Sequence, residues 1–91
     1  MLPKASGPAD LGLTPEESAY IEIKLSLARE LKKGRLKKEL SQTALASKLG
    51  SSQSRVAKME SADSQVSLDL IVRSLLATGK RPREIARAVA R

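Results

Sequence analysis

Few residue types in this 91-residue chain could carry out acid–base, nucleophilic or metal chemistry. The sequence contains no His and no Cys, which excludes a His-based triad, an HExxH metal site and a thiolate zinc site. Carboxylates, lysines, serines and Tyr20 remain, but no pair of them has the spacing of a catalytic site. A chain this short also leaves little room for a deep pocket. We therefore expect no enzyme, no catalytic residue, no metal and no cofactor.

Basic side chains are concentrated in the middle of the chain, where they could bind a polyanion. Nine Lys or Arg and two Asp or Glu lie between residues 29 and 58, and the whole chain has a formal net charge of +7. Such a concentration is typical of a nucleic-acid-binding surface, although an ordinary solvated surface would also account for it. Tyr20 is the only aromatic residue, which excludes stacking of bases in the manner of RRM or OB domains.

The elements that position these residues are all predicted to be helices, because apolar residues recur at helical spacing and no strand pattern is present. A flexible arm is expected over residues 1–13 and a single domain over 14–91. The first helix begins after Thr14, the N-cap of a capping box with Glu17, and Gly34 is expected to kink or split it. Its main apolar stripe is Tyr20, Ile23, Leu27 and Leu31. A second stripe, Ile21, Leu25 and Ala28, is either a partner surface or a widened core face.

Further helices are predicted over residues 41–49, 53–61 and 67–78, with a polar loop at 62–66. A last helix begins near Pro82 and is expected to turn Ile85, Ala86 and Val89 to one side. These segments give an all-α fold, a compact bundle of about five helices.

Residues 41–60 predict two short helices joined by a tight turn, which is a helix-turn-helix arrangement. Ala46 is small enough for the second helix to cross close to the first, and Gly50 permits a positive φ in the turn. Val56 is expected to insert into the core and to fix the rotation of the second helix. The expected motif core is Leu45, Ala46, Leu49, Gly50, Val56 and Met59.

The pattern Ser41-Gln42, Leu45-Ala46, Leu49-Gly50, Ser52-Gln53, Val56 and Met59-Glu60 resembles the Xre/Cro/C1-type helix-turn-helix regulators of bacteria and phages. The resemblance covers about residues 27–79, and the long first helix is also similar to that of the HigA-like antitoxin branch. It implies a lambda-repressor-like DNA-binding domain. Two positions depart from the pattern: Glu39 stands where the family usually has Gly or another turn residue, and Gly34 replaces a residue that is more often apolar.

The resemblance implies that the helix beginning near Ser52 lies in the DNA major groove, where Gln53 would bond adenine and Arg55 would bond guanine. The implied base-reading residues are Ser52, Gln53, Ser54, Arg55 and Lys58. The implied phosphate contacts are Ser41, Gln42, Ser51, Lys37 and Lys38, and Gln42 could also brace Gln53. Arg29, Lys32, Lys33 and Arg35 could add phosphate contacts or only long-range attraction. Glu60 would repel phosphate, so we expect it to have a structural role in the turn that follows it.

Three functions fit these observations to different degrees. The first is a sequence-specific transcriptional regulator, a repressor that binds a pseudo-palindromic operator in double-stranded DNA as a homodimer. The second is an antitoxin that binds a small toxin protein and represses its own operon. The third, a non-specific binder of RNA or anionic membrane, leaves the motif unexplained. No apolar run approaches the length of about 18 residues that a membrane span needs. We therefore expect a cytoplasmic protein that makes no membrane contact.

Overall fold

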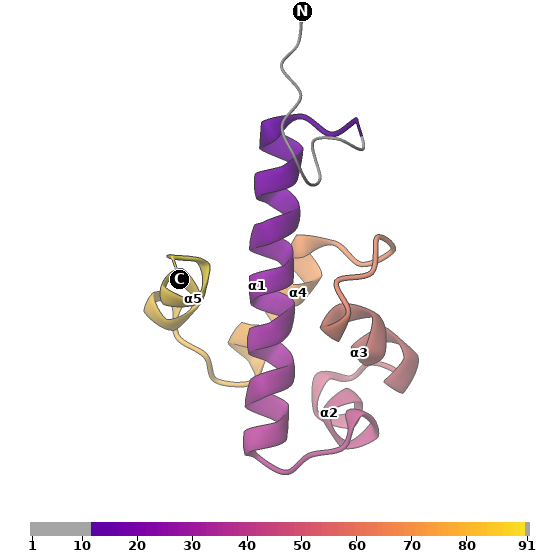
Figure 1. Cartoon of the computed structure of the whole chain (residues 1–91). Coiled ribbons are helices and arrows are strands. Elements are labelled where there is room, and N and C mark those ends of the chain that lie inside the picture. Colours follow the sequence, from indigo (N-terminus) through magenta and orange to yellow (C-terminus); the bar gives the residue numbers. More distant parts are fainter. Residues whose placement is uncertain (1–11, 91) are drawn as a thin grey trace, which may run out of the picture.

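Five α-helices and no strand make up residues 12–90, the part of the chain that this computed structural model describes. They are α1 (Pro15–Lys37), α2 (Gln42–Leu49), α3 (Gln53–Glu60), α4 (Leu68–Ala77) and α5 (Pro82–Ala90). Figure 1 shows α1 as the central column, with α2 and α3 on one side of it and α5 on the other. The predicted all-α fold is confirmed. Residues 1–11 of the expected N-terminal arm lie outside the described range.

The first helix begins as its capping residues predict. The Glu17 amide donates to Thr14 Oγ1 at 3.0 Å, and the Thr14 amide donates to Glu17 Oε1 at 2.8 Å, so the capping box is complete. The expected break at Gly34 is wrong, because α1 continues through this residue to Lys37 as one helix. Its 23 residues span about 34 Å. Because of this length, α1 packs against α3, α4 and α5.

The helices α1 to α4 all end in the same hydrogen-bond pattern, in which two amides beyond the helix bond back to carbonyls of its last turn. At the end of α1, the Glu39 amide donates to the Leu36 carbonyl and the Leu40 amide to the Arg35 carbonyl. This Schellman motif requires one residue with a positive φ. Glu39 takes this conformation with φ 58°, at the position where the resembling family usually has Gly. The corresponding residues after α2, α3 and α4 are Gly50, Ala62 and Gly79.

The core lies between α1, α2, α3 and α4. Its largest fully buried side chains are Leu27, Val56, Met59, Ile71 and Leu75. Val66, in the loop predicted as polar, is also buried and belongs to the core. Ala28 belongs to the core as well, whereas Ile21 is 37% exposed. The second apolar stripe is therefore shared between the core and the surface.

The orientation of α5 differs from the prediction. Ala88 is buried and Ile85 is half-buried, but Ala86 and Val89 are exposed. The helix packs against α1 and α4 with the face that carries Ile85 and Ala88. Ala86 lies about 100° around the helix axis from Ile85, so it is not part of that face. Within residues 12–90, none of the helices combines the length and the apolar character that a membrane span requires.

Candidate nucleic-acid interface

The first turn of α3 presents its side chains to solvent. Ser52, Gln53, Ser54 and Arg55 are all exposed, whereas Val56 and Met59 are completely buried. Ser52 caps the helix, since its Oγ accepts a hydrogen bond from the Arg55 amide at 3.2 Å. The two buried side chains fix the rotation of α3 about its axis. Four of the five residues that the sequence assigned to base reading therefore share one exposed end of the helix.

The first turn of α2 lies beside this end of α3. Ser41 caps α2 through its Oγ, which accepts from the Ala44 amide at 3.0 Å. The side-chain oxygen of Gln42 accepts from Gln53 Nε2 at 2.6 Å, so Gln42 holds the amide that the sequence assigned to adenine. The Gln42 Nε2 in turn donates to Glu60 Oε1 at 3.1 Å.

Glu60 connects this pair of glutamines to the end of α1. Arg35 donates to Glu60 from Nε at 2.6 Å and from a terminal nitrogen at 3.0 Å, and it also donates to the Leu40 carbonyl at 2.8 Å. The side chains of Arg35 and Glu60 are only 9% and 4% exposed. The hydrogen bond to Glu60 and the charge of this carboxylate raise the pKa of Arg35, against the opposing effect of burial.

Arg35 is thus bound within the fold rather than placed to contact phosphate, which corrects one of the expected roles. Glu60 does have a structural role, but its partners are Arg35 and Gln42 rather than the turn that follows it, where the sequence predicted that role. The pairing of Arg35 with Glu60 was not predicted from the sequence, although the sequence contains one indication of it. Glu60 is the only acidic residue between positions 40 and 60, and a carboxylate that closes a basic motif needs a cation.

The remaining predicted contact residues are more dispersed. Lys58 donates to Gln65 Oε1 at 2.7 Å, beside the loop that follows α3. Lys38 donates to the Thr78 carbonyl at 3.0 Å at the end of α4, and Lys37 is exposed in the last turn of α1. The Ser51 Oγ is buried and has no hydrogen-bond partner among the described residues. The structure therefore groups Ser41, Gln42 and residues 52–55, but brings neither Lys37, Lys38 nor the Ser51 hydroxyl to that group.

The electrostatic character of α2 and α3 differs from that of the other helices. α1, α4 and α5 each have an acidic residue in the first turn, but α2 and α3 have none. Neither helix dipole is therefore offset at its positive end by a carboxylate within the first turn of its own helix. Such ends attract phosphate through their free amides. Among residues 12–90 no group of three or more His, Cys, Asp or Glu could hold a metal ion.

Comparison with known protein families gives one match. Residues 31–85, more than half of the chain, match the family described as Helix-turn-helix. No curated protein and no solved structure matches the chain. The matched range contains both α2 and α3 together with the Arg35–Glu60 pair that ties them to α1. The chain therefore belongs to the Xre/Cro/C1-type helix-turn-helix family and is a DNA-binding regulator.

Proposed function

We propose that the chain is a transcriptional repressor that binds a pseudo-palindromic operator as a homodimer and blocks a promoter by occupying it. The observation that supports this best is the exposed first turn of α3, with Gln53 held by Gln42. A side chain that is already oriented loses less conformational entropy when it binds a base. Occupation of the promoter by the bound protein requires only the helices described above.

In this proposal, α3 lies in the major groove with its N-terminal turn against the bases. Gln53 bonds adenine through N6 and N7, and Arg55 bonds guanine through O6 and N7. Ser52 and Ser54 contact a base or the sugar–phosphate backbone, and Lys58 reaches the edge of the groove. Ser41 and Gln42 bind phosphate at the N-terminus of α2, whose first turn contains no acidic residue. Lys37 and Lys38 add phosphate contacts just before Ser41 in the chain.

Pairing of two copies follows from the number of base pairs that one helix can read. A single recognition helix contacts only a few base pairs, which is too few for a specific site in a genome, whereas two helices read two half-sites. We propose the outer face of α1 around Ile21 as the pairing surface. Ile21 is 37% exposed and Leu25 beside it is half-buried, so part of this apolar stripe is free for a second copy.

A binding selection from randomised duplex DNA at about 0.15 M salt tests the proposal. We expect enrichment of an inverted repeat whose half-site centres lie about 10–11 bp apart. Enrichment of a single half-site would contradict the homodimer. Weak binding without enrichment, which fades as salt rises, would mean that the basic surface gives only general attraction and that α3 reads no sequence.

The substitution Gln53→Ala tests the role of one base-reading residue. The loss of its bidentate contact is expected to relax the preference for one base pair in each half-site by about 1–3 kcal/mol. Selection with the variant and with Thr43→Ala, an exposed neighbour of Gln42 outside the proposed contacts, measures the change. If Gln53→Ala and the unchanged chain selected the same sites, Gln53 would not read the operator.

A second candidate function is that of an antitoxin, as in the HigA-like branch. The N-terminal half of α1 supports it, because Glu16, Glu17 and Glu22 are exposed there next to Tyr20 and Ile21. This acidic and apolar surface would suit a small basic toxin protein. A neighbouring gene should then encode a small basic protein whose expression arrests growth, and co-expression of this chain should restore growth. Ile21→Glu should abolish this rescue while DNA binding by α3 to a half-site persists. Failure of the unchanged chain to rescue growth would exclude this function.

A further inference from the structure

A groove runs along the side of α1 that faces α5. It consists of two adjoining cavities of about 270 and 580 Å³, which share Glu30 in their walls. The smaller one lies between Arg29, Lys33 and Ala88, and the larger one continues past Gly34 to Lys80. These volumes are in the range of small-molecule sites. In Figure 1, α5 and the side of α1 that faces it lie across the molecule from α3. The larger cavity also extends to Leu45 and Lys48 of α2 and to Lys37 and Lys38, which are proposed above to contact DNA phosphate.

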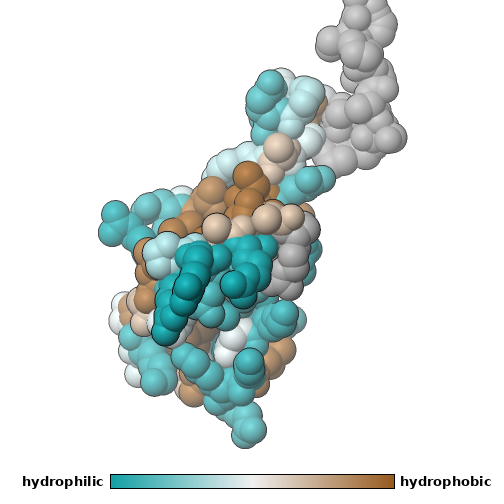
Figure 2. Space-filling model, turned by 90° about the vertical axis from the view of Figure 1, so that its left-hand side faces the viewer, coloured by the Kyte–Doolittle hydropathy of each residue, from teal (hydrophilic) through white to brown (hydrophobic). Residues whose placement is uncertain are grey.

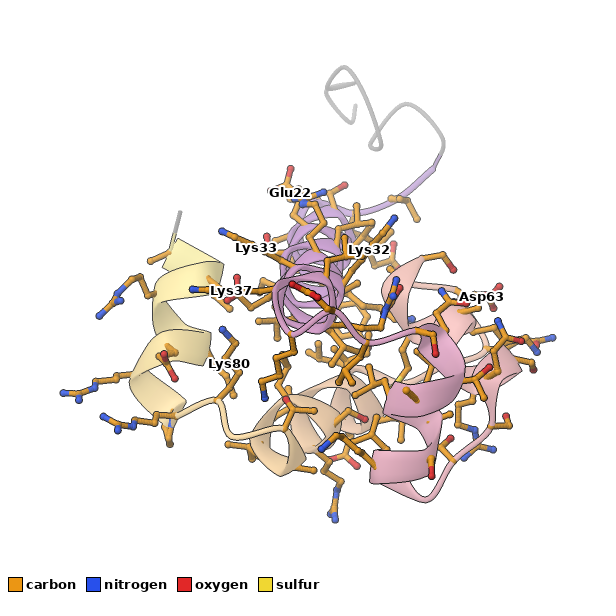
Figure 3. The ribbon with its side chains drawn as sticks, turned by 90° about the horizontal axis from the view of Figure 1, so that it is seen from below. Glu22, Lys32, Lys33, Lys37, Asp63 and Lys80 are labelled. Carbon is orange, nitrogen blue, oxygen red and sulfur yellow. The ribbon has the colours of Figure 1, made fainter. Side chains whose placement is uncertain are left out.

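The walls of the groove are strongly cationic. Arg29, Lys33 and Lys37 follow each other at intervals of four residues along α1, which brings like charges together and costs about 0.2–0.5 kcal/mol for each pair. Figure 3 shows Lys33, Lys37 and Lys80 on the α5 side of α1, whereas Lys32 lies on the other side. Figure 2, with α5 towards the viewer, shows hydrophilic side chains over the centre of this face.

Two carboxylates also line the groove, and both already have partners within the fold. Glu30 Oε2 lies 3.0 Å from Lys80 Nζ, and the Arg81 amide donates to Glu84 Oε1 at 2.8 Å. That hydrogen bond, together with the charges of Lys80, Arg81 and Arg87, lowers the pKa of Glu84, as expected in a positive potential. The cationic side chains along the walls outnumber these two carboxylates.

The floor of the groove is open because α1 has a glycine there. A glycine inside a helix costs up to about 1 kcal/mol relative to alanine. Packing does not require it, because a Cβ at Gly34 would lie 3.7 Å from Lys80 Cε, an ordinary contact distance. A longer side chain at position 34 would instead project into the larger cavity, whose wall Gly34 forms. The glycine therefore weakens the helix and keeps the groove free.

We propose that this groove binds an oligophosphate, with Arg29, Lys33 and Lys80 as its ligands. Closely spaced cations with long side chains match a short chain of phosphates, each of which offers several acceptor oxygens. The walls contain no aromatic side chain on which a nucleobase could stack. The groove thus recognises the phosphate chain itself, whether this is free or part of a nucleotide, and gives the regulator a ligand other than DNA.

Isothermal titration of the full chain with tripolyphosphate at about 0.15 M salt tests this proposal. Tripolyphosphate and ATP should bind with similar affinity, and AMP should bind much more weakly. The double substitution Arg29→Gln and Lys33→Gln should weaken binding by about tenfold or more, since charge-assisted hydrogen bonds are lost. The matched control, Lys32→Gln with Arg73→Gln, removes the same two residue types outside the groove walls and should have little effect.

A third variant separates filling of the groove from loss of charge. Gly34→Leu retains every cation and should raise the thermal stability of α1, but it should block tripolyphosphate binding, whereas Gly34→Ala should bind it. Equal weakening by the groove variant and the control would show that only the net charge matters and would overturn the proposal. Loss of tripolyphosphate binding on Arg55→Gln alone would place the anion at α3 and would also overturn it.

Discussion

The ion pair between Arg35 and Glu60 joins α1 to the end of α3, and its strength follows from its burial. Removing one partner leaves an uncompensated charge in a poorly solvated place. We therefore expect Glu60→Leu to lower the free energy of unfolding by about 2–3 kcal/mol. Urea unfolding followed by circular dichroism measures the change.

Two further substitutions show whether the burial of this ion pair causes the loss of stability. The double substitution Arg35→Met with Glu60→Leu should recover much of the loss, because no unpaired charge remains. Asp69→Asn breaks the exposed pair with Arg73, whose side chains are 76% and 72% exposed, and should change the stability by less than about 0.5 kcal/mol. If Glu60→Leu were as mild as Asp69→Asn, Glu60 would not support the position of α3.

The roles of some site residues could be predicted from the sequence, namely those that depend only on residues nearby in the chain. Ser41 and Ser52 are N-caps in the structure, and a cap depends only on the following turn. The contact between Gln42 and Gln53 was also anticipated, because both belong to one motif. The pairing of Arg35 with Glu60 was not, since these residues lie 25 positions apart and meet only when α1 packs against α3.

Substitutions at the ends of the helices test how much the strained backbone there destabilises the fold. Glu39 and Gly50 occupy the same left-handed position after α1 and α2, with φ of 58° and 64°. This conformation costs a residue with a Cβ about 1–2 kcal/mol. Glu39→Gly should therefore raise the free energy of unfolding by about 0.5–1 kcal/mol, because the relief of strain exceeds the added entropy of the unfolded chain.

Gly50→Ala provides the reciprocal experiment. An added Cβ at Gly50 meets no atom within 4 Å, so any loss reflects the backbone alone. A decrease of about 1 kcal/mol is expected. Thermal unfolding of both variants measures the two changes, and a decrease in stability for Glu39→Gly would show that the Glu39 side chain contributes more than its strained backbone costs.

The stability of the first turn of α5 should depend on pH. The hydrogen bond from the Arg81 amide and the neighbouring positive charges lower the pKa of Glu84 below its ordinary value of 4.5. A carboxylate with a lowered folded-state pKa stabilises the fold above its unfolded-state pKa, and this contribution is lost as the pH falls through the folded-state value.

The first turn of α5 should therefore begin to fray as the pH falls below about 4.5. The amide shifts of Ile85 and Arg87 in NMR spectra would report it, with the α4 residue Leu75 as the internal reference. Glu84→Gln should remove this pH dependence, because its amide does not titrate. Identical titration curves for Glu84→Gln and the unchanged chain would assign the transition to another group.

The elements themselves were predicted well where caps and strong apolar stripes occur. Thr14, Ser41 and Ser67 mark the starts of α1, α2 and α4, and each is the N-cap in the structure. The face of α5 was not predictable in the same way. Its apolar residues are mainly small, and burial of Ala88 rather than Ala86 depends on where α1 offers space.

Across the whole molecule, exposed acidic side chains are concentrated near the start of α1 and basic ones near its end. The acidic residues Glu16, Glu17 and Glu22 lie in its first half, whereas Lys37 and Lys38 end it next to the motif. A duplex approaching the basic part is repelled by the acidic part, so this division orients the molecule on DNA. The number of phosphates that the basic part neutralises can be measured, because each one contributes about 0.9 to the salt dependence of binding to duplex DNA.

This relation tests both the lysine contacts and the dimer in one experiment. If Lys37 and Lys38 each bind a phosphate, Lys37→Gln with Lys38→Gln should reduce the slope of log K against log salt by about 1.8 for one protomer. A homodimer on two half-sites should show about twice that reduction. Arg83→Gln, in α5 across the molecule from α3, serves as the control and should leave the slope unchanged. An unchanged slope in the double variant would remove both lysines from the DNA surface, and a reduction of only about 1.8 would mean that one protomer binds alone.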